Sequence, residues 1–164
     1  MTLPQPPHES EGNSHMRKRM AILLGGVLVA VGVVAAVALA RPSMSSMSFK
    51  ANLDTRQEVP KESGASIRAG GKFTATLSGT KLTWKLSFDH LTGSATAAHV
   101  HSGAKGKAGP VIVALCGPCK SPASGTARVT AAVAKMLQSG NTYVNVHTAK
   151  NPNGEIRGQV KGSM

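Results

Sequence analysis

Three histidines have the residue type and spacing of a transition-metal site. His99 and His101 lie in an alternating stretch typical of a β-strand, and side chains two residues apart in a strand project from the same face. His147 lies in a second such stretch, on the face that carries Tyr143 and Asn145. If the two strands lie side by side, the three imidazoles converge. Such a set suits copper or zinc, with a fourth coordination position left open.

Two other interpretations of these histidines stay open. In the first, which the sequence alone favours over a metal site, the rings hydrogen-bond to one another and to loop backbone, and so hold the turn at residues 102–110. In the second, the site is redox-active, because a His-x-His with a distant histidine resembles the copper centre of copper–zinc superoxide dismutase. Arg157 is then a candidate anion-contacting residue, although the bridging histidine and the aspartate ligand of that enzyme have no counterpart here. His90 follows a predicted strand and is expected in an exposed turn.

Cys116 and Cys119 form a CGPC sequence, which redox proteins carry between a strand and a helix. Pro122 and Gly125 disfavour a helix after this sequence, and no alternation of strands and helices surrounds it. In an oxidising compartment two cysteines at this spacing close a small loop disulfide. We therefore predict the disulfide, with a labile redox pair and a contribution to a metal site as the alternatives.

Acid–base catalysis finds little support in the sequence. The acidic residues after Arg41 are few, and none is paired at a useful spacing; they are Asp54, Glu58, Glu62, Asp89 and Glu155. Glu155 and Arg157 are expected to form a structural ion pair. No serine lies in a Gly-x-Ser-x-Gly turn, so we do not predict an enzyme.

The elements that must position these residues are short strands. Residues 72–77 and 81–88 alternate between apolar and polar side chains around a Ser-Gly-Thr turn, which predicts a hairpin with one buried face. Residues 131–139 have a helical pattern, with Gly140 at the C-cap. This predicts an all-β domain, an antiparallel Greek-key sandwich or barrel with one short helix. Further strands are expected at 49–54, 95–101, 110–115, 125–130, 142–148 and 154–161.

The first forty residues predict a membrane segment. Residues 1–15 have the composition of a disordered tail. Residues 16–40 combine a basic flank, Arg17-Lys18-Arg19, with twenty uncharged residues that span about 30 Å as a helix. The basic flank places the tail in the cytoplasm and the following domain outside. We favour an uncleaved single-pass anchor followed by a linker at 41–48, over a signal peptide cut after Ala40. Translation from Met1 or from Met16 stays open.

The charge balance indicates an anionic partner. The chain has 164 residues and a formal net charge of +12, which attracts polyanions. The basic residues are scattered, and no aromatic residues lie between them to stack on bases, so nucleic acid is not expected. The predicted partners are the membrane, and a cell-surface protein or an anionic polymer of the envelope.

Several motifs in order resemble the CHRD domain of chordin-type proteins and of many exported bacterial proteins. They are QEVP at 57–60, AHVHSG at 98–103, GPVIV at 109–113, YVNVHT at 143–148 and NPNGEIRGQV at 151–160. The resemblance covers residues 49–161 and implies an extracytoplasmic β-domain, but no settled activity. The chain lacks the cysteine-rich modules that bind growth factors in chordin-type proteins. We therefore expect an exported, membrane-anchored binding or structural module; the alternative is a copper- or zinc-binding protein.

Overall fold

The computed structural model describes residues 45–163, which form a β-domain with one α-helix and one 3-10 turn. No helix within these residues is long and apolar enough to span a membrane. The predicted tail, membrane segment and cleavage point after Ala40 lie outside the described residues. The elements are β1 (Ser46–Asp54), η1 (Thr55–Gln57), β2 (Gly70–Ser78), β3 (Lys81–Asp89), β4 (Ala95–Ser102), β5 (Val111–Cys116), β6 (Ala123–Arg128), α1 (Ala131–Gln138), β7 (Thr142–Thr148), β8 (Ile156–Gln159) and β9 (Lys161–Ser163).

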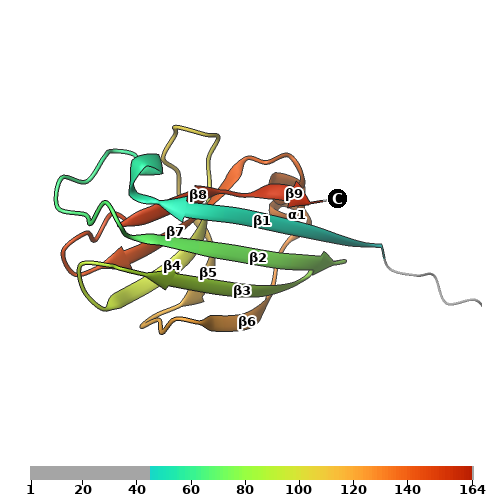
Figure 1. Cartoon of the computed structure of the whole chain (residues 1–164). Coiled ribbons are helices and arrows are strands. Elements are labelled where there is room, and N and C mark those ends of the chain that lie inside the picture. Colours follow the sequence, from blue (N-terminus) through green and yellow to red (C-terminus); the bar gives the residue numbers. More distant parts are fainter. Residues whose placement is uncertain (1–44, 164) are drawn as a thin grey trace, which may run out of the picture. The chain divides into compact units, whose positions relative to one another are not determined.

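All nine strands of the described region belong to one sheet, in the order β5-β4-β7-β8-β1-β2-β3-β6, with β9 also paired to β1. Every pairing is antiparallel. Strands β5 and β6 stand at the two ends of this order and contact each other, so the sheet is nearly closed and barrel-like (Figure 1). The predicted antiparallel β fold with one helix is confirmed. The sheet curls on itself, and it is not divided into the two separate sheets of a sandwich.

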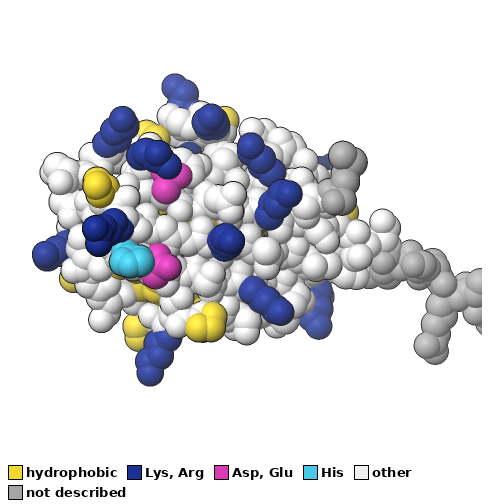
Figure 2. Space-filling view, viewed as in Figure 1, with side chains coloured by type: hydrophobic (Ala, Val, Ile, Leu, Met, Phe, Trp, Pro, Cys, Tyr) yellow, Lys and Arg dark blue, Asp and Glu magenta, His cyan; other side chains and the backbone are white. Residues whose placement is uncertain are grey.

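Alternation along β1, β2 and β3 places apolar side chains inside the barrel and polar ones outside. Phe49, Phe73 and Leu82 are among the fully buried side chains, and removing such side chains from water drives folding. Trp84 packs on β6 at Gly125, where a Cβ atom would lie 2.7 Å from the indole ring. The outward positions of these strands are rich in lysine, serine and threonine, and the space-filling view from this side shows the basic side chains among them (Figure 2).

Strand β7 differs from the others because all seven of its residues are buried. Val144 and Val146 face the core, as the alternation predicts. The opposite face lies under loop backbone: Tyr143 contacts Gly109, and His147 contacts Pro152. The polar side chains of β7 therefore lie in an enclosed layer between the sheet and its loops.

Two boundaries differ from the sequence prediction. Strand β1 begins at Ser46, within the segment 41–48 that was expected to be the linker. The predicted strand 154–161 divides at Val160 into β8, which pairs with β7, and β9, which pairs with β1. Val160 is fully buried, and its N–H donates to Thr142 O at 2.9 Å. The chain thus changes partner strand at this residue.

Candidate functional site

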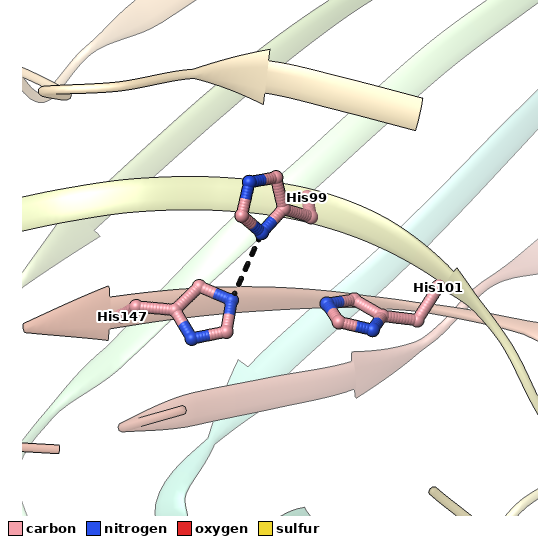
Figure 3. Close-up of side chains that lie close together, drawn as sticks. All are labelled: His99, His101 and His147. Carbon is pink, nitrogen blue, oxygen red and sulfur yellow. Dashed lines mark hydrogen bonds between the residues drawn. The ribbon is translucent and has the colours of Figure 1, made fainter. Parts of the chain in front are cut away.

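The three predicted histidines lie together between strands β4 and β7. Antiparallel register pairs Ala97 with His147 and His99 with Asn145, so the imidazoles project into one region. His99 Nδ1 and His147 Nε2 are 3.1 Å apart, and each of the three residues offers one nitrogen within 4.8 Å of the others (Figure 3). The convergence expected from the spacing is therefore observed.

Backbone carbonyls orient two of these rings. His101 Nδ1 lies 3.0 Å from Gly109 O, and His147 Nδ1 lies 3.0 Å from Pro152 O. A carbonyl oxygen only accepts, so Nδ1 carries the hydrogen in each neutral ring and Nε2 keeps its lone pair. Within the described residues His101 Nε2 is buried and has no hydrogen-bond partner. Two lone pairs therefore point into the cluster.

Burial lowers the pKa of all three imidazoles and so favours their neutral form. It is the largest cause that lowers the pKa of His99, and the neighbouring His101 lowers it further. Burial likewise lowers the pKa of His101, against the opposing effect of the Gly109 hydrogen bond. The pKa of His147 falls to about 4, again mainly through burial. Neutral imidazole is the form that binds a metal ion.

Tyr143 connects the histidines to Arg157. The rings of His101 and Tyr143 stack, with centroids 4.9 Å apart and planes at 12°. The Arg157 guanidinium lies over the Tyr143 ring, 3.5 Å from its centroid. Arg157 is 2% exposed, and its Nη2 donates to Ala104 O at 3.3 Å and Lys107 O at 2.8 Å. Arg157 therefore holds the loop between β4 and β5 in place above the histidines.

The prediction of an ion pair between Glu155 and Arg157 is wrong, because within residues 45–163 no ion pair joins them. Glu155 precedes β8, and its carboxylate accepts hydrogen bonds from Thr92, Thr148 and Asn151. Burial raises the pKa of this carboxyl, but the hydrogen bonds outweigh burial and leave it below its ordinary value. Glu155 thus ties the loop after β7 to the loop before β4.

Glu58 belongs to the same polar layer, although its sequence context did not mark it as a site residue. Its side chain is 4% exposed, and Asn145 Nδ2 donates to its Oε2 at 3.3 Å. Its Oε1 and Asn145 Oδ1 are buried without partners among the described residues. Burial raises the pKa of Glu58 to about 7, against the lowering effect of Arg157. Its place in the QEVP motif was the one available signal.

The other predicted residues lie outside this cluster. Cys116 and Cys119 form a disulfide with Cα atoms 5.3 Å apart, and the described residues include no free cysteine. The predicted loop disulfide is therefore confirmed. His90 is exposed, as expected, in the loop that follows β3, with φ 54° and next to Asp89.

The fold and the site define a class: a barrel-like antiparallel β-domain with three imidazoles, a carboxyl and an arginine enclosed under its loops. The family model of the CHRD domain matches residues 49–160. The chain therefore belongs to the CHRD family, as the motifs predicted. No curated protein and no solved structure matches the sequence.

Proposed function

We propose that this CHRD domain works outside the cytoplasm as a binding module, anchored by residues 21–40, and that it binds a copper or zinc ion through His99, His101 and His147. The observation that carries the proposal is the buried, unpartnered Nε2 of His101 beside two other ring nitrogens. Leaving such an atom unsatisfied costs about 1–3 kcal/mol. Metal coordination removes that cost.

The residues fit such an ion. Nitrogen ligands about 2.0–2.1 Å from a tetrahedral ion lie roughly 3.3 Å from each other. The His99 Nδ1–His147 Nε2 separation of 3.1 Å is already close to this spacing. Carbonyl oxygens that accept from Nδ1 of His101 and His147 are the outer partners that metal-binding histidines ordinarily have.

The purely structural interpretation accounts for part of these contacts. Hydrogen bonds from His101 to Gly109 and from His147 to Pro152 hold the two loops whether or not an ion binds. They leave Nε2 of His101 without a role. Metal binding gives that atom a partner, and we therefore prefer it. Copper would add redox chemistry to the site, and zinc would not.

Metal titration tests the proposal. The full-length protein in a mild detergent is stripped with a chelator and titrated with Zn²⁺ or Cu²⁺. We expect the wild-type protein to bind one ion per chain. His101→Ala and His147→Ala should each lower the metal affinity by roughly a hundredfold or more. His90→Ala is the matched control, because His90 is exposed and outside the cluster.

Circular dichroism of each variant verifies that it is folded. If His101→Ala and His90→Ala bind metal with equal affinity, the ion binds non-specifically to surface histidines and not to the cluster. No binding by the folded wild-type protein would favour the structural interpretation. Competition between Cu²⁺ and Zn²⁺, measured on the same preparation, then identifies the preferred ion.

A further inference from the structure

The outer face of the sheet opposite the core carries side chains in ordered rows. Cross-strand pairing aligns five hydroxyl residues, one from each of five strands. We call this the hydroxyl row: Ser163, Ser48, Thr76, Thr83 and Thr126. Neighbouring strands lie about 4.8 Å apart, so the row runs across the sheet with hydroxyl groups at a regular spacing.

A second row, parallel to the hydroxyl row, contains three lysines. The same pairing aligns Lys161 with Lys50, then Thr74, Lys85 and Ser124. We call this the lysine row; it lies two residues, or roughly 6.8 Å, from the hydroxyl row. The two rows together form the lysine–threonine face. The acidic side chains of the paired strands on this side, Asp54 and Asp89, lie at one end, where both align with Gly70.

The lysine–threonine face has one depression between the two rows and a second beyond the lysine row, on the side away from the hydroxyl row. One depression of about 400 Å³ is lined by residues of both rows, among them Lys50, Thr76 and Thr83. A second, of about 440 Å³, continues past Lys72 and Ser124. Thr74 and Lys85 line both depressions, so the two are adjacent. Figure 2 shows this side of the molecule, where lysine and arginine side chains are spread over the surface and outnumber the few acidic ones.

We infer that the lysine–threonine face binds a linear anionic polysaccharide whose chain lies along the two rows. Hydroxyl side chains both donate and accept hydrogen bonds, as sugar hydroxyls do, while the lysines pair with carboxylates on the sugars. Each exposed charge pair contributes little by itself. A repeating ligand that engages several at once gains affinity through multivalency.

Other polyanions match the face less well. Proteins that bind single-stranded nucleic acid use exposed aromatic platforms, whereas the aromatic residues Phe49, Phe73 and Trp84 are all buried under this face. The inference does not depend on the histidines, which lie on β4 and β7. Only the expectation that the polymer belongs to the cell envelope depends on the proposed function.

Polygalacturonate is a suitable probe. Its binding to the full-length protein is measured in the presence of a chelator, so that failure of the metal site cannot affect the result. Lys50→Gln/Lys85→Gln removes two charges from the lysine row and is expected to weaken binding roughly tenfold. Lys135→Gln/Lys150→Gln is the matched control, because it removes the same charge from exposed positions outside the face.

A second pair of variants tests the hydroxyl row. Thr76→Val/Thr83→Val keeps the shape of both side chains and removes their hydroxyls, and should weaken polygalacturonate binding roughly fivefold. Thr96→Val, at an exposed position on β4, should leave binding unchanged. Thermal unfolding verifies that each variant is folded.

Two further ligands complete the test: neutral dextran, which should not bind, and polyphosphate, which should bind more weakly and without dependence on the two threonines. The inference is overturned if the two lysine double variants lose affinity equally, because net charge alone would then explain binding. It is also overturned if polyphosphate binds as tightly as polygalacturonate, or if polygalacturonate does not bind in 0.15 M salt, about the physiological ionic strength.

Discussion

At the residue scale, one loop carbonyl determines what His101 can do. The Gly109 oxygen accepts from Nδ1 and so leaves the Nε2 lone pair facing the other two rings. The sequence predicted that the rings share a region, because the two-residue period of strands is a local property. It could not predict which nitrogen would be free, since the 102–110 loop reaches His101 only through tertiary folding.

Glu58 makes the stability of the domain depend on pH. Its pKa is raised from 4.5 to about 7 in the folded state, so the folded protein holds this proton to a higher pH than the unfolded chain. The stabilisation is complete below pH 4.5 and is lost as pH rises through 7. We expect wild-type protein to lose roughly 1–3 kcal/mol between pH 5 and pH 8 from this group.

Glu58→Gln should remove that loss, because an amide does not ionise, and should therefore be relatively stabilising at pH 8. Urea denaturation at pH 5 and pH 8 measures the difference. Asp89→Asn, at an exposed position, is the control. Its free energy of unfolding should change between pH 5 and pH 8 by the same amount as that of the wild type. If Glu58→Gln shows the same change in free energy of unfolding between pH 5 and pH 8 as the wild type, the Glu58 carboxyl does not titrate in this range.

Gly154 keeps the polar layer in place. Its φ of 134° is a conformation that residues with a side chain rarely adopt, and an added Cβ would overlap the Asn145 amide. We expect Gly154→Ala to lower the free energy of unfolding by roughly 2–3 kcal/mol and to weaken metal binding. Chemical denaturation measures the first effect. Gly93→Ala should be nearly neutral, because nothing lies within 4 Å of its Cβ position.

At the scale of elements, the local patterns predicted most of the strands. The hairpin expected at 72–77 and 81–88 spans Gly70–Ser78 and Lys81–Asp89, because alternation and the turn are both encoded nearby. The burial of β7 on both faces was not predicted. It depends on loops from other parts of the chain, whose positions no local pattern encodes. The division of 154–161 at Val160 likewise depends on the separate pairing of β8 and β9.

The disulfide closes a four-residue ring at the end of β5, and its contribution to stability should be modest. Loop-closure entropy for so short a ring gives about 2 kcal/mol. Cys116→Ala/Cys119→Ala should therefore unfold at a lower urea concentration, by an amount that corresponds to this energy. Metal stoichiometry should stay the same as in the wild type. A loss of bound metal in this variant would place sulfur among the ligands.

At the scale of the whole molecule, the two proposed binding functions use different parts of one sheet. The histidines lie on β4 and β7, and the lysine–threonine face lies on β1, β2, β3, β6 and β9. Strand β8 separates the two groups in the sheet order. The high net charge predicted an anionic partner from composition. Its arrangement in rows could not be predicted, because the rows arise from cross-strand register.

Anchoring would hold both sites at the membrane surface, and the predicted anchor can be tested in cells. The uncharged run 21–40 exceeds the ~7–15 apolar residues usual in a signal peptide, so we expect the mature chain to keep it. Mass spectrometry of the protein from the membrane fraction should give an N-terminus before residue 21, and added protease should reach the domain in intact spheroplasts. A soluble product that begins at Arg41 would instead establish cleavage after Ala40. Replacing Arg17, Lys18 and Arg19 by glutamate should protect the domain from the protease, because basic flanks favour the cytoplasmic side.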